Sequence, residues 1–106
     1  MRRVAVTGLG VVSPLGNSAD EAFASARAGR SGIHRLDAPF ANRLVDPLVA
    51  SARFDGADHF DPPKLRMLDR VSQFALFAAN QAVSEARIDL SEVDHRRAGV
   101  FVGTGM

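Results

Sequence analysis

The feature that most constrains the fold is a pair of short, largely apolar segments near the two ends of the chain. Residues 3–7 and 98–103 are rich in β-branched side chains and show no alternation of polar and apolar positions. This pattern is typical of strands that are covered on both faces of a parallel sheet. Parallel neighbours need a long crossover, and the chain between the two segments contains predicted helices. We therefore predict an α/β chain that opens with a right-handed βαβ unit.

Two helices are predicted within the crossover. The first spans about residues 19–28, because Ser18 and Glu21 have the spacing of a capping box and Gly29 supplies a C-terminal stop. The second spans about residues 69–86. Its apolar positions cover so much of the helix circumference that we expect it to be buried on several sides.

The stretch between the helices is less regular. Residues 30–61 are rich in Gly, Pro, Asp and Asn, with one short strand predicted at about 49–54. Asp61-Pro62-Pro63 indicates a helix start in which an aspartate oxygen caps the first turn. Two strands leave open sheet edges, and residues 103–106 read as the opening of a loop. We therefore expect residues 1–106 to be part of one domain, with no second domain in this chain.

Composition excludes several classes of function. Apolar residues at 46% and charged residues at 24% are ordinary for a globular protein, and 13 basic against 12 acidic side chains give no reason to expect nucleic-acid binding. The chain has no cysteine, which excludes disulfides and thiol nucleophiles within it. No segment approaches the roughly 20 apolar residues of a membrane span, and no signal-peptide core is present. We expect a cytoplasmic protein.

Gly8-Leu9-Gly10-Val11-Val12-Ser13 follows the first predicted strand and resembles the dinucleotide fingerprint GxGxxG. The third glycine is replaced by Ser13, and Pro14 and Gly16 delay the following helix. A small dinucleotide-binding module is the least favoured alternative.

No metal site or cofactor is predicted. His34, His59 and His95 are far apart and lack the i, i+4 spacing that directs two imidazoles at one ion. The acidic cluster at Asp55, Asp58 and Asp61 lacks the glycine and glutamate of a calcium loop, so we interpret it as turn and cap chemistry.

Four segments together resemble the β-ketoacyl-acyl-carrier-protein synthases of the thiolase superfamily, in the order and at the spacing of that family. They cover the chain from end to end: residues 4–17 (VAVTGLGVVSPLGN), 28–33 (AGRSGI), 68–76 (LDRVSQFAL) and 99–105 (GVFVGTG). The resemblance implies that the chain is the first βαβ portion of a thiolase-like α/β/α/β/α layered sandwich, incomplete by itself, from a homodimeric enzyme.

The activity implied by the resemblance is the condensation of an acyl chain with malonyl-acyl-carrier protein. In the family a cysteine takes the acyl chain and two histidines assist decarboxylation. His34, His59 and His95 match neither histidine, and no cysteine is present. We therefore expect no catalytic residue in this chain and no activity from it alone.

Two non-catalytic roles are implied residue by residue. Met106 occupies the position after Gly-Thr-Gly that, in the family, lines the acyl pocket, so it is the substrate-binding candidate. Lys64 and Arg66, near Arg70, fall in the stretch that receives the acidic acyl carrier protein, although solvated helix-end cations are the simpler interpretation. A non-catalytic, chain-length-factor type of subunit that completes a partner's fold is the main alternative function.

Overall fold

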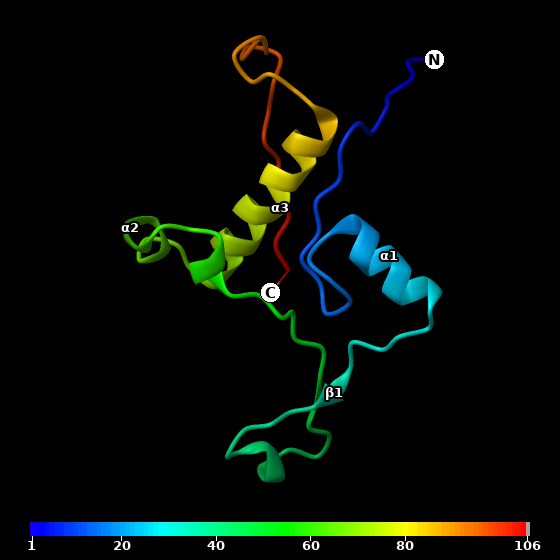
Figure 1. The fold of residues 1–106 in the computed structure, drawn as a ribbon, viewed down its shortest axis with the longest axis vertical. Helices are drawn as coiled ribbons and strands as arrows, with labels where there is room; N and C mark the ends of the chain where they lie inside the picture. Colours follow the sequence, from blue (N-terminus) through cyan, green and yellow to red (C-terminus); the bar gives the residue numbers. More distant parts are fainter. Residues whose placement is uncertain (106) are drawn as a thin grey trace.

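The computed structural model describes residues 1–105 and contains short helices and one small sheet (Figure 1). The elements, in chain order, are α1 (Ala19–Arg27), β1 (His34–Arg35), η1 (Ala41–Arg43), β2 (Leu48–Val49), η2 (Gly56–Asp58), α2 (Pro62–Leu65) and α3 (Arg70–Ala86). β1 and β2 pair antiparallel, with His34 opposite Val49 and Arg35 opposite Leu48. The α/β content agrees with the prediction, but the sheet is an antiparallel ribbon.

The longest helix, α3, supports the N-terminal segment through direct backbone contact. A Cβ atom added at Gly8 would overlap the carbonyl oxygen of Ala82, and one added at Gly10 would overlap that of Ala78. Ala78 and Ala82 lie one turn apart and form a ridge of small side chains on one face of α3. The two glycines thus serve close packing of a strand-like segment on a helix.

Two polar side chains of α3 hold the same segment by its backbone. The Gln81 Oε1 atom accepts a hydrogen bond from the amide of Val11 at 2.9 Å, and its Nε2 group donates to the carbonyl of Asn17. One turn further along, the Glu85 carboxylate accepts from the amide of Leu9. These bonds satisfy backbone groups that have no strand partner within the described residues.

Both ends of α1 follow the sequence prediction closely. The Ser18 hydroxyl accepts from the Glu21 amide at 3.1 Å, while the Glu21 carboxylate accepts from the amide of Asn17 at 2.9 Å. The reciprocal bond of the capping box therefore reaches one residue further back than expected. Gly29 has φ +66°, and the amide of Arg30 donates to the carbonyl of Ser25 at 2.9 Å, which forms a Schellman stop.

A small aromatic core joins the chain before α2 to α3. The ring of Phe54, 8% exposed, meets the edges of Phe74 and Phe77 at centroid distances of 5.3 and 5.0 Å. Phe60, also 8% exposed, precedes α2. Such edge-to-face pairs add about 1 kcal/mol each beyond their buried area, so this cluster fixes η2 and α2 against α3.

The two terminal strand predictions are wrong for the structure as described. Residues 3–7 and 98–103 belong to no strand within residues 1–105, and their side chains are exposed, with Val4 at 93% and Phe101 at 96%. The strand predicted over residues 49–54 is shorter than expected and ends at Val49. A β-strand is stable only when a neighbour completes its hydrogen-bond ladder, and no described segment pairs with either terminal stretch.

The expectation that the long helix is buried on several sides is also wrong. Within the described chain no side chain of α3 is fully buried, and Val71 is 62% exposed. Only the N-terminal segment and the aromatic core cover part of its surface. The accessible surface of 9336 Å² far exceeds the roughly 5,700 Å² expected for a folded chain of this mass, and the radius of gyration is 17.3 Å against about 13 Å.

No helix among residues 1–105 is long and apolar enough to cross a membrane.

We predict that Gly10→Ala lowers the free energy of unfolding of the chain by about 3 kcal/mol, because the new methyl group collides with the backbone of α3 rather than with a movable side chain. Chemical denaturation followed by circular dichroism measures the change. Gly103→Ala is the matched control, since a Cβ there meets no atom within 4 Å. Equal effects of the two substitutions would contradict the packing role of Gly10.

A second prediction concerns acid stability of α3. Asp69 caps this helix by accepting from the Ser72 amide at 2.7 Å, and its hydrogen bonds with the side chain and then the backbone of Ser72 lower its pKa below the ordinary 3.8. Because the pKa of Asp69 is lower in the folded than in the unfolded chain, its carboxylate stabilises the fold at pH values above 3.8. This stabilisation is lost as the pH falls through the pKa that Asp69 has in the folded chain. Helicity at 222 nm should therefore drop below pH 3.8.

Asp69→Asn should remove most of that acid-dependent loss. Asp89→Asn is the control, because the pKa of Asp89 is lowered in the same way by Ser91 but the residue lies beyond the end of α3. Asp89→Asn should keep the acid transition of α3, and an unchanged transition in Asp69→Asn would refute the capping account.

Candidate functional site

The α2 segment forms a fixed platform on one side of α3. Leu65 packs so closely on Gly56 that a Cβ on that glycine would lie 2.7 Å from the leucine Cδ1 atom. The Gln73 Nε2 group of α3 donates to the carbonyl of Leu68 at 3.1 Å, which ties the end of the platform to the long helix. Asp61 is the N-cap residue of α2 but its side chain makes no capping hydrogen bond, so the predicted aspartate cap is wrong.

Both docking candidates are exposed on this platform. Lys64 lies inside α2, with its Nζ atom 5.6 Å from the centre of the Phe60 ring, and Arg66 is the C-cap residue. Two residues along a helical turn are about 200° apart, so the two cations flank α2 instead of sharing one face. Lys64 and Arg66 are therefore two separate positive charges, and Lys64 lies beside the buried Phe60 ring.

Arg70 has a more defined position than the sequence indicates. Its guanidinium lies 4.7 Å from the centre of the Phe74 ring and 5.4 Å from that of Phe54. Cation–π contacts of this kind hold the first turn of α3 over the aromatic core. Arg70 thus contacts two aromatic rings and Lys64 contacts one, while Arg66 is exposed at the C-cap of α2. The substrate-binding candidate, Met106, lies outside the described residues.

The three histidines and the acidic cluster form no metal site in the part of the chain that the structure describes. His59 stacks on Phe54 at a centroid distance of 4.9 Å and on Phe77 at 4.4 Å, so its ring extends the aromatic core. Asp55 accepts from the amide of Ala57 at 2.9 Å and caps η2, as the turn interpretation predicts for it.

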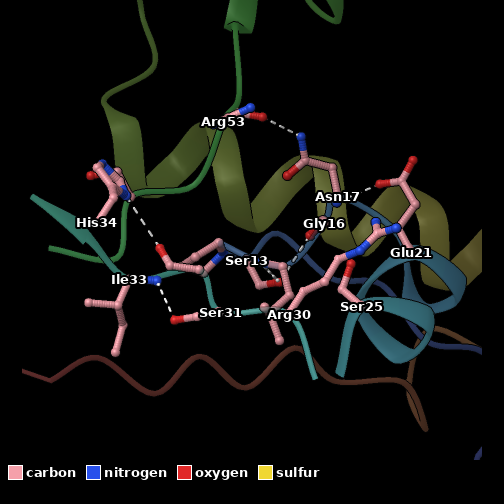
Figure 2. A pocket seen from close by; sticks show the side chains of 14 residues that line it. Ser13, Gly16, Asn17, Glu21, Ser25, Arg30, Ser31, Ile33, His34 and Arg53 are labelled. Atoms are coloured by element: carbon pink, nitrogen blue, oxygen red, sulfur yellow. Dashed lines mark hydrogen bonds between the residues drawn. The ribbon is translucent and has the colours of Figure 1, made fainter. Parts of the chain in front are cut away.

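A polar pocket of about 440 Å³ lies between the N-terminal loop, the end of α1 and the base of the hairpin (Figure 2). The Asn17 Nδ2 group donates to the carbonyl of Arg53 at 2.6 Å and closes one wall. Gly32 packs against Pro14 and closes another, since a Cβ on Gly32 would lie 2.6 Å from the proline Cβ. Sequence reasoning missed this pocket, because only the fold brings residues 13–17, 25–34 and 51–53 together.

The comparison with protein families decides the assignment. The sequence model described as "Beta-ketoacyl synthase, N-terminal domain" matches residues 1–106. The chain belongs to this family. Of the segments that suggested the resemblance, residues 4–17 contain the glycines that pack on α3 and residues 68–76 contain its start, whereas residues 99–105 are exposed.

Relatives in this ketosynthase family resemble the whole chain but are much longer. The chain is 36% identical over 109 residues to a "3-oxoacyl-[acyl-carrier-protein] synthase 2" of Staphylococcus aureus (strain COL), a match that covers 99% of this chain. It is 37% identical over 106 residues to the protein of the same name from Coxiella burnetii. The chain spans 26% of the length of each of these relatives.

Proposed function

We propose that the complete protein containing this ketosynthase segment is a 3-oxoacyl-acyl-carrier-protein synthase, which condenses a carrier-bound acyl chain with malonyl-acyl-carrier protein in fatty-acid synthesis. The observation that carries this proposal is the family match over all 106 residues, supported by relatives at 36–37% identity that bear this name. The acyl carrier protein is the partner that the names of those relatives imply.

The reacting groups of the proposed enzyme lie outside this segment. A nucleophilic thiolate needs a cysteine, and the chain has none. Since the chain spans only about a quarter of its relatives, the cysteine and the two catalytic histidines have ample room elsewhere in the complete protein. Residues 1–106 then form part of the folded core, one wall of the acyl pocket at Met106 and a docking surface for the carrier protein. They do not catalyse condensation themselves.

The exposed terminal segments fit the same proposal. Residues 3–7 and 98–103 have the composition of covered parallel strands but lack ladder partners in the described chain. We propose that they become strands of a thiolase-like layered sandwich when the rest of the polypeptide pairs with them, in a cytoplasmic homodimer. The excess accessible surface described above is the area that this completion would bury.

The activity test compares the complete protein with the 106-residue chain. With radiolabelled malonyl-acyl-carrier protein and a carrier-bound acyl chain, the complete protein should form the 3-oxoacyl product and a cerulenin-type reagent should label it. The 106-residue chain should do neither. Condensation by the short chain would refute the proposal that the reacting groups lie outside residues 1–106. A complete protein with neither cysteine nor activity would favour the non-catalytic, chain-length-factor type of subunit.

Carrier docking is assigned to Lys64 and Arg66, because they are exposed cations on a platform that Leu65, Gly56 and Gln73 hold in place. Charges at the rim of an interface mainly change association rates and their salt dependence.

We predict that the double reversal Lys64→Glu/Arg66→Glu raises the KM of the complete protein for acyl-carrier protein roughly tenfold while kcat changes little. The effect should shrink at 0.5 M salt, where charges are screened. Arg35→Glu/Arg43→Glu is the matched control, since both arginines are exposed on the hairpin, away from α2 (Figure 1). Equal effects of the two double variants would contradict docking at α2.

A further inference from the structure

The polar pocket beside α1 has no part in the proposed condensation or in carrier docking. It lies between α1 and the base of the hairpin, and none of its lining residues belongs to α2. Its walls are pinned by the Asn17–Arg53 hydrogen bond and by the Gly32–Pro14 packing described above. A pocket with fixed walls is a candidate for a bound molecule, and its side chains indicate which kind.

Two arginines, Arg53 and Arg30, line the pocket, and Arg30 directly follows the Schellman stop of α1. Figure 2 shows its side chain extending across the pocket toward Asn17 and Glu21. The Ser25 side chain lies beneath it and is only 9% exposed. Ser13, Ser31 and Ser51 also line the pocket; the Ser13 hydroxyl donates to the carbonyl of Gly16, which leaves Ser31 and Ser51 to donate to a ligand. A planar guanidinium beside several hydroxyl donors is a typical setting for an oxyanion.

The pocket also holds acceptors that require a donor from the ligand. The Asn17 Oδ1 atom is buried and has no hydrogen-bond partner among the described residues, although the Nδ2 group of the same side chain is satisfied. The Glu21 carboxylate uses one oxygen to accept from the amide of Asn17. A buried acceptor without a donor costs about 1–3 kcal/mol, so a ligand that brings a proton to Asn17 gains over one that does not.

We propose that this pocket binds inorganic phosphate. The phosphoryl oxygens accept from the Arg30 guanidinium and the serine hydroxyls, while a protonated phosphate oxygen donates to Asn17 Oδ1 or Glu21. Sulfate has the same shape and charge but carries no proton at neutral pH. The two acceptors therefore select phosphate over sulfate.

The test is phosphate binding to the complete protein at pH 7, measured by isothermal titration calorimetry and by ³¹P line broadening. Inorganic phosphate should bind at least tenfold more tightly than sulfate. Arg30→Gln should weaken phosphate binding at least tenfold, and Ser25→Ala about threefold.

Arg43→Gln is the control, because Arg43 is an exposed arginine of η1 that does not line the pocket. It should leave phosphate affinity unchanged, and circular dichroism should show that every variant keeps its helices. Absence of phosphate binding, or equal loss in Arg30→Gln and Arg43→Gln, would overturn the site. Equal affinity for sulfate would overturn the role given to Asn17 and Glu21.

Discussion

The close approach of Gly8 and Gly10 to the alanine ridge of α3 is the contact on which the rest of the structure depends. It brings the start of the chain against a helix that begins some sixty residues later, and it does so without any side chain between the two backbones. Gln81 and Glu85 then bind the amides and a carbonyl that this approach exposes. α1 follows from the end of the same loop, so its position, and with it one wall of the polar pocket, is set by the contact between glycine and alanine.

The same contact explains why the glycine pair is not a dinucleotide fingerprint. In that motif the glycines let the backbone approach a pyrophosphate at a helix N-terminus. Here they let it approach the carbonyls of Ala78 and Ala82, which leaves no room for a ligand at that place.

Local signals in the sequence predicted local structure well. The Ser18–Glu21 box and the Gly29 stop both appear, because each depends on groups within a few residues of one another, whereas the predicted Asp61 cap does not form. Strands depend on distant partners, so the prediction of strands at residues 3–7 and 98–103, made from composition, was wrong for the described chain, where both segments are exposed and unpaired. Of the candidate site, Lys64 and Arg66 could be named from the family resemblance. The polar pocket could not, because Asn17, Arg30 and Arg53 meet only through tertiary contacts.

The central claim is that residues 3–7 and 98–103 of this ketosynthase segment form strands only when the rest of the complete protein pairs with them. Hydrogen–deuterium exchange of residues 3–7 and 98–103, compared between the 106-residue chain and the complete protein, tests it most directly. The account predicts fast exchange of these amides in the short chain and at least a hundredfold slower exchange in the complete protein. Protection of the α3 amides should differ less between the two proteins. Strong protection of both segments in the short chain would show a closed sheet of its own and would contradict the account.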